Sequence, residues 1–114
     1  MSEDTIFGKI ARGEMDANIV YEDDLCLAFR DLYPAAPMHI LLIPRKPIAR
    51  LCDAENEDQA LLGHMMLMAT KVAALEGLDD KYRLVINNGA GAGQSVFHLH
   101  MHIIGGRELS WPPG

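Results

Sequence analysis

One short segment, residues 98–104 with the sequence His-Leu-His-Met-His-Ile-Ile, constrains the fold more than any other. Imidazole and apolar side chains alternate along it, and side chains two residues apart on a β-strand lie on the same face. A strand over 96–104 places three imidazoles on one face: His98, His100 and His102. Four apolar side chains lie on the opposite face: Phe97, Leu99, Met101 and Ile103. The apolar face must pack under another layer, so the imidazole face is left for a cleft or for solvent.

Hydrophobic spacing predicts the remaining elements of secondary structure. Further strands are expected over 19–21, 25–29, 38–43 and 82–88. Two helices are also expected: a short one over 4–12 capped by Asp4, and a long one over 55–77 that stops at Gly77. The apolar stripe of the long helix is expected to consist of Leu61, Met65, Met68, Val72 and Leu75. His64, beside this stripe, is interpreted as a structural or surface histidine. This order predicts an α+β fold with one long and one short helix and a largely antiparallel sheet of about five strands.

Length and charge exclude several classes of protein. The 114 residues suffice for a single domain, 1–114, with its own hydrophobic core. A net charge of -6 argues against a nucleic-acid-binding surface, which needs a basic patch. The segment 1–9 lacks the apolar core of a secretory signal, and no apolar run reaches the roughly 20 residues that span a bilayer. Cys26 and Cys52 have no metal-binding spacing and indicate reduced thiols in a cytoplasmic protein.

The aligned histidines allow a chemical role as well as a structural one. In a metal site, imidazoles at positions i, i+2 and i+4 span roughly 13 Å of an extended strand. An ion with metal–nitrogen distances near 2 Å accepts two of them, and His39 is the residue that could join such a pair. In a nucleophilic site, mutual repulsion keeps at least one imidazole neutral for attack while another handles a proton. The natural electrophile for such a site is phosphorus.

A glycine-rich segment directly before the histidines favours the phosphorus chemistry. In Gly89-Ala-Gly-Ala-Gly-Gln-Ser95, Gly89, Gly91 and Gly93 let backbone N–H groups approach an anion, and Ser95 adds a hydroxyl donor. The segment lacks the dinucleotide-binding and P-loop patterns, and a strand rather than a helix follows it. Ser95 is not expected to be a nucleophile, because no G-x-S-x-G elbow surrounds it. We interpret the segment as a phosphate cradle.

The combination of motifs resembles a known family. His98-Leu-His-Met-His-Ile-Ile104 fits the histidine-triad motif, in which histidines alternate with apolar residues. The whole chain is similar to the Hint branch of that superfamily, the purine nucleoside phosphoramidases. The similarity extends over the following segments: Ile6-Phe-Gly-Lys-Ile10, Pro37-Met-His-Ile-Leu-Leu-Ile-Pro-Arg-Lys46, Gly93-Gln-Ser95, Gly105-Gly-Arg107 and Trp111-Pro-Pro-Gly114.

The resemblance implies a role for each matching residue. His100 would be the nucleophile that takes the nucleoside monophosphate, His102 would contact the phosphate or the leaving group, and His98 would orient His100. His39 would join the proton network. Asn87, Gly93 and Ser95 would hold the phosphate oxygens, and Asp31 would bind the ribose hydroxyls. Phe7, Ile10 and Leu32 would line the purine pocket. No metal and no other cofactor is implied.

The resemblance also implies partners and leaves alternatives open. The expected ligand is a purine nucleotide or nucleoside phosphoramidate, and the expected assembly is a homodimer whose sheet continues across the interface, with no nucleic-acid or membrane partner. Ser110 stands where animal relatives often carry histidine, in a tail that reaches the partner's site, so the preferred leaving group is open. Two rival functions remain: hydrolysis of dinucleoside polyphosphates or nucleotidyl transfer, and a nucleotide-responsive interaction protein.

Overall fold

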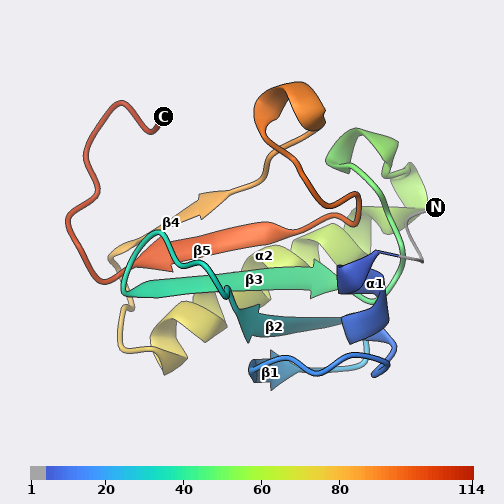
Figure 1. The fold of residues 1–114 in the computed structure, drawn as a ribbon, viewed down its shortest axis with the longest axis horizontal. Coiled ribbons are helices and arrows are strands. Elements are labelled where there is room, and N and C mark those ends of the chain that lie inside the picture. Colours follow the sequence, from blue (N-terminus) through green and yellow to red (C-terminus); the bar gives the residue numbers. More distant parts are fainter. Residues whose placement is uncertain (1–4) are drawn as a thin grey trace.

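The computed structural model describes residues 5–114 and has an α+β fold (Figure 1). Its strands form one antiparallel sheet in the order β1-β2-β3-β5-β4. Their bounds are β1 Ile19–Glu22, β2 Cys26–Arg30, β3 Met38–Pro44, β4 Tyr82–Val85 and β5 Met101–Gly105. The predicted fold class, the five strands and their antiparallel pairing are confirmed, although β4 and β5 are shorter than expected.

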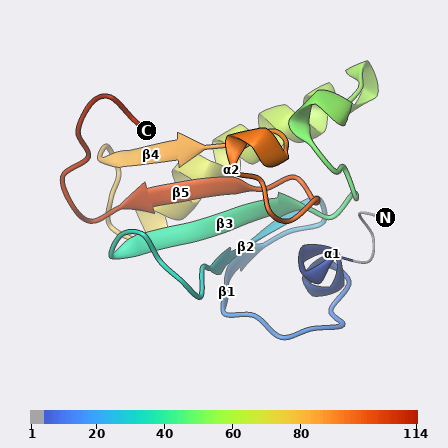
Figure 2. The same cartoon turned by 45° about the horizontal axis from the view of Figure 1, so that its top comes forward.

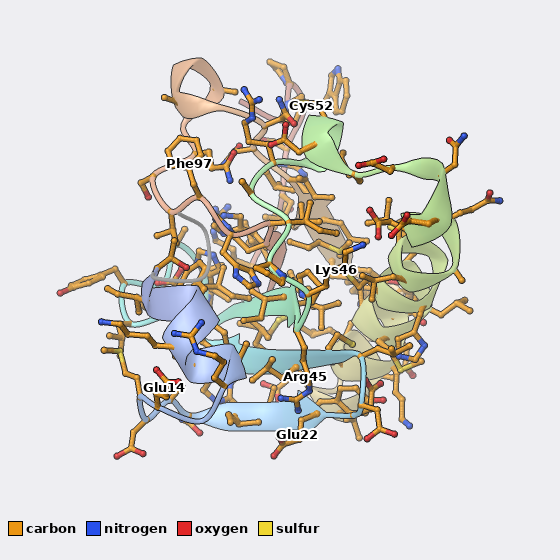
Figure 3. The ribbon with its side chains drawn as sticks, turned by 90° about the vertical axis from the view of Figure 1, so that its right-hand side faces the viewer. Glu14, Glu22, Arg45, Lys46, Cys52 and Phe97 are labelled. Atoms are coloured by element: carbon orange, nitrogen blue, oxygen red, sulfur yellow. The ribbon has the colours of Figure 1, made fainter. Side chains whose placement is uncertain are left out.

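Two helices cover opposite faces of the sheet, α1 Ile6–Ala11 on one and α2 Gln59–Leu75 on the other (Figures 2 and 3). Three short 3-10 turns complete the elements: η2 Leu51–Asp53, η3 Asn56–Asp58 and η4 Ala90–Ala92. The cap expected at Asp4 lies outside the described residues, and the Thr5 hydroxyl accepts the Gly8 N–H at 2.9 Å. Gly77 has a φ of +79° just after α2, so glycine ends this helix as predicted.

A hydrophobic core lies on each face of the sheet. On the α2 side, Met101 and Ile103 of β5 pack with Met65, Ala69 and Val72 of the helix. On the α1 side, the core consists of Ile10, Ala11, Leu27, Phe29, Leu41 and Ile43. Because β3 contributes to both cores, all seven of its residues are buried, and apart from His39 all of them are apolar.

Two basic residues just after β3 connect the sheet to the two helices, one to α1 and the other to the start of α2. Arg45 donates from Nη1 to the carbonyl of Ala11 at the end of α1, at 2.9 Å, and from Nη2 to Glu22 at 3.1 Å. The next residue, Lys46, reaches the opposite side and pairs with Asp58 at the start of α2 (Figure 3). Adjacent residues of an extended chain point to opposite faces, which explains this division.

Three smaller expectations can be compared with the structure. Cys26 is buried, Cys52 is exposed, and both are free thiols. His64 on α2 places Nε2 2.7 Å from Asp23 Oδ2, which fits the structural role expected of it. In the part of the chain that the structure describes, no helix is both long and apolar enough to span a bilayer.

Candidate active site

The three histidines of the 98–104 segment do not share one strand face. The strand β5 begins at Met101, so the prediction of a strand over 96–104 is wrong for its first five residues. The reason lies in Pro44, which has no N–H to donate and whose carbonyl instead faces His98 Nε2 at 2.8 Å. Leu99 N–H bonds the Ile48 carbonyl at 2.6 Å, so this stretch joins the loop after β3. Phe97 consequently stays 39% exposed, where we had expected it under the long helix.

His98 therefore lies in the core rather than in a cleft. Its side chain is fully buried, and since a carbonyl only accepts, Nε2 carries the proton that points to Pro44. The backbone carbonyl of His98 faces His100 Nδ1 at 2.8 Å. His98 thus contacts the next histidine through its main chain, which agrees with an orienting role.

His100 is held as a neutral imidazole with a defined tautomer. Its Nδ1 must carry the proton that bonds the His98 carbonyl, which leaves the lone pair on Nε2. Burial is the main cause that lowers the pKa of His100 from 6.5, while the bond to His98 and the charge of Asp31 act in the opposite sense. The Phe7 ring meets the imidazole edge-on, with centroids 4.9 Å apart. A neutral ring with a free lone pair is the form that attacks an electrophile.

His102 lies on β5 beside His39 of β3. His102 Nδ1 is 2.8 Å from His39 Nε2, and the ring centroids of His100 and His102 are 5.1 Å apart. Burial, and to a smaller extent the neighbouring His100 and His39, lower the pKa of His102 to about 4, while the charge of Asp31 acts in the opposite sense. His39 Nδ1 accepts the N–H of Ala35 at 2.9 Å, and its Nε2 lies 3.4 Å from Asp31 Oδ2.

His100 and His102 border a cavity of about 400 Å³ between α1 and the adjacent strands and loops. Of the residues predicted for a nucleotide site, the cavity is also lined by Phe7, Ile10, Asp31, Leu32 and Ser95. All of its remaining lining residues are ones that we did not predict: Ile6, Met15, Asp16, Ala17, Asn18, Phe29, Arg30, Tyr33, Leu41 and Val96. Phe29 and Leu41 lie in segments that we predicted only as strands, and nothing in the local spacing distinguished these two residues from the other apolar positions of those strands.

Asn87 and Gly93 lie together near this cavity but do not line it. Gly93 has a φ of +97°, and a Cβ built on it would stand 3.9 Å from Asn87 Nδ2. Gln94, which we did not predict, holds the glycine-rich segment from within: its buried side-chain amide accepts from Gly89 N–H at 2.8 Å and donates to the Ala49 carbonyl at 2.8 Å. The only sequence signal for Gln94 is its place beside the glycines, where backbone N–H groups need an acceptor.

A metal ion would have a different ligand set from the one considered first. Since His98 faces Pro44, the three histidines of the 98–104 segment cannot converge on one ion. Among residues 5–114, Asp31, His39 and His102 bring one ligand atom each within 4.8 Å of the others, as do Asp23, Cys26 and His64. In both groups the donor atoms already face one another at hydrogen-bond distance, such as 2.8 Å between His39 and His102.

Comparisons with known proteins agree with this geometry. The model of the HIT domain family matches residues 12–109. A HIT-like protein of Synechococcus elongatus is 64% identical over 114 residues, the full length of both chains. The crystal structure of a HIT family hydrolase from Legionella pneumophila has a TM-score of 0.94 and 48% identity, covering 97% of this chain and all of that one. A histidine triad nucleotide-binding protein from Candida albicans has a TM-score of 0.80 and 28% identity, covering 96% and 83%. The chain belongs to the HIT family.

Proposed function

We propose that this protein is a purine nucleoside phosphoramidase of the Hint branch, which hydrolyses the P–N bond of nucleoside 5'-phosphoramidates. The observation that carries the proposal is the state of His100. Its Nδ1 is committed to the His98 carbonyl at 2.8 Å, so a neutral ring keeps its lone pair on Nε2 while the side chain borders the cavity. The hydrolase and nucleotide-binding descriptions of the Legionella and Candida proteins support the same reading.

The cavity offers separate surroundings for the base and for the phosphorus. Phe7, Ile10 and Leu32 contribute apolar surface on which a purine can lie, and Leu32 is 85% exposed, so a bound base would cover it. Asp31 supplies a carboxylate for the ribose hydroxyls. Ser95 borders the same cavity as His100 and His102, and we assign it, with the neighbouring pair Asn87 and Gly93, to the phosphate cradle.

The reaction proceeds in two displacements at phosphorus. His100 Nε2 attacks, the bond from phosphorus to the amine nitrogen breaks, and the amine leaves with a proton that reaches it from solvent by a relay through His39 and Ser95. His102 is neutral, so its N–H donates a hydrogen bond and is not the source of this proton. The hydroxyl of Ser95 and nearby backbone N–H groups stabilise charge on the phosphoryl oxygens. Water then displaces the imidazole, which releases the nucleoside monophosphate and restores neutral His100.

The test is turnover of adenosine phosphoramidate by a His100→Ala variant. We expect turnover to be lost while the fold, checked by circular dichroism, and binding of adenosine monophosphate are retained. His64→Ala is the matched control, because His64 lies on α2, bonds Asp23 and does not line the cavity, so its loss should leave turnover intact. Turnover by His100→Ala at the rate of the control would refute the role given to His100.

The rival activities use the same nucleophile and differ in the leaving group. Comparing kcat/KM for adenosine phosphoramidate and for a diadenosine polyphosphate separates them, and the proposal requires the phosphoramidate to be the better substrate. A protein that only binds nucleotides and other proteins would turn over neither substrate. Chelation is a further arm: since we assign no metal, turnover should survive exhaustive treatment with a chelator.

We also propose that the protein is a homodimer with a sheet continued through β4. β4 is an edge strand of the sheet. The outer face of α2 exposes Met66, Leu67 and Leu75 by 51%, 65% and 61%, and Lys71 is the one residue of its 17 with a fixed charge. Trp111 in the tail is 83% exposed, which fits a tail that docks on a second copy. Sedimentation tests the proposed dimer. The wild-type protein should sediment as a dimer and the Leu67→Glu variant as a monomer, and a monomeric wild type would refute the proposal.

A further inference from the structure

The imidazole of His39 lies between a backbone amide and His102. The N–H of Ala35 faces His39 Nδ1 at 2.9 Å, and His39 Nε2 faces His102 Nδ1 at 2.8 Å. A backbone N–H can only donate, so His39 Nδ1 must accept and cannot hold the ring's proton. The proton of a neutral His39 is therefore on Nε2, where it points to His102.

A second acceptor on the same side supports this assignment. Asp31 Oδ2 lies 3.4 Å from His39 Nε2, and a carboxylate oxygen only accepts. Two acceptors, Asp31 Oδ2 and His102 Nδ1, thus converge on the nitrogen that we assign as the donor. The opposite arrangement would leave the Ala35 N–H facing another N–H and the carboxylate facing a lone pair.

The tautomer of His102 follows from that of His39. His102 Nδ1 accepts from His39, so a neutral His102 keeps its own proton on Nε2. His100 has the opposite arrangement, with its proton on Nδ1 and its lone pair on Nε2. Both rings border the same cavity, with centroids 5.1 Å apart. One ring therefore offers a lone pair and the other an N–H.

We infer that the Ala35 amide is a positioning group: acting through His39, it fixes His102 as the Nε2–H donor to the phosphoryl group that His100 attacks. This inference rests on the proposed function and adds a residue without a functional side chain to the groups that act on the reaction. Ala35 and His39 are positioning groups in this scheme, whereas His100 and His102 contact the substrate. No covalent step is added, because the proton of His102 forms a hydrogen bond to an oxygen on phosphorus.

The carbonyl of Ala35 and the loop that precedes it are also held by hydrogen bonds. Arg107 Nε, in the segment after β5, lies 3.3 Å from the Ala35 carbonyl. Asp31 Oδ1 accepts the Tyr33 N–H at 2.8 Å, and the Asp31 N–H bonds the His39 carbonyl at 3.0 Å, so the loop before β3 closes on itself. These contacts hold the chain on both sides of the Ala35 N–H, which helps to keep this donor in place beside the imidazole.

The direct test is the tautomeric state of each ring in the wild-type protein. Long-range ¹H–¹⁵N spectra of histidine-labelled protein near neutral pH distinguish Nδ1–H from Nε2–H rings. We expect Nε2–H for His39 and His102 and Nδ1–H for His100. A His102 ring with its proton on Nδ1, or an even mixture of tautomers, would overturn the inference. The measurement needs no substitution, so it does not depend on whether a variant folds.

Two pairs of variants test the effect on catalysis. Ala35→Pro removes the N–H, and its control Ala35→Ser keeps it. The proline variant should shift His102 toward the Nδ1–H tautomer and lower kcat by about 100-fold, a typical effect of losing one hydrogen-bond donor to the transition state, with little change in KM. His39→Gln keeps an N–H near the position of Nε2 and should preserve the His102 tautomer and more of kcat than His39→Leu. Equal tautomers and equal kcat within both pairs would overturn the inference.

Failure of this inference can be told apart from failure of the proposed function. If His100→Ala keeps its turnover, the proposed function fails and the tautomer of His102 has no catalytic meaning. If His100→Ala is inactive but wild-type His102 carries its proton on Nδ1, only the role of the Ala35 amide fails.

Discussion

The free energy of unfolding should fall steeply in mild acid because of His102. Burial is the main reason why its pKa is about 4 in the folded chain instead of 6.5. Between these values the unfolded chain binds a proton that the folded chain does not, so the unfolded state is favoured as the pH falls. With about 1.4 kcal/mol for each pH unit, the full loss is about 3 kcal/mol, and about 2 kcal/mol of it is reached at pH 5.

Urea unfolding of wild-type and His102→Gln protein at about pH 7.5 and about pH 5 measures this contribution. Glutamine keeps a hydrogen-bonding side chain but does not titrate. The protein concentration is held constant, because assembly would otherwise change the apparent stability. The wild type should lose about 2 kcal/mol more than the variant between the two conditions. Equal losses would show that His102 is not held neutral by the fold, and the reasoning about its environment would be wrong.

Three further outcomes are expected. Gly93→Ala should lower the free energy of unfolding in urea by about 1 kcal/mol, because Gly93 has a φ of +97°, and should weaken the binding of adenosine monophosphate measured by calorimetry. Gly91→Ala is the control: Gly91 has open space around it and no positive φ, so neither quantity should change. Phe7→Ala should raise the Kd for the same nucleotide about 10-fold in calorimetry, because contact with the base is lost. An unchanged Kd would show that Phe7 does not contact the bound base. The acid limb of kcat/KM should have its midpoint below pH 6.5, since burial lowers the pKa of His100; a midpoint above 6.5 would contradict this.

Periodicity was enough to predict the elements that pack in the two cores. β3 is apolar at every position except His39 because both of its faces are buried, and α2 shows helical spacing and is followed by Gly77. The positions of His100 and His102 in one site also followed from the histidine alternation. Such features depend on residues close in the sequence, where spacing and side-chain direction are linked.

The remaining errors came from contacts between distant residues. His98 leaves the predicted strand face because its ring meets the carbonyl of Pro44, 54 residues earlier. The burial of Gln94 follows from its bond to the Ala49 carbonyl, and no periodicity encodes that contact. Leu75 was expected in the stripe of the long helix, but it is 61% exposed at the last turn of α2.

The lining of the cavity likewise combines residues that were predicted from the sequence with residues that were not. Its histidines and Phe7 were predicted from motifs, whereas Phe29 and Leu41 come from strands that had read only as core. The sheet order places β2 and β3 next to each other under α1, and the cavity wall is a consequence of that order. A wall assembled from several elements has no signature in any one of them.

The central claim is that His100 Nε2 becomes bonded to phosphorus during turnover. Rapid acid-free quenching of the enzyme during hydrolysis of a slow adenosine phosphoramidate, followed by intact and peptide mass spectrometry, tests it most directly. We predict a nucleotidyl group that fragmentation of the peptide locates on His100, and its absence in His100→Ala protein. An adduct on Ser95 or His102, or turnover with an adduct still formed in the His100→Ala variant, would contradict the account.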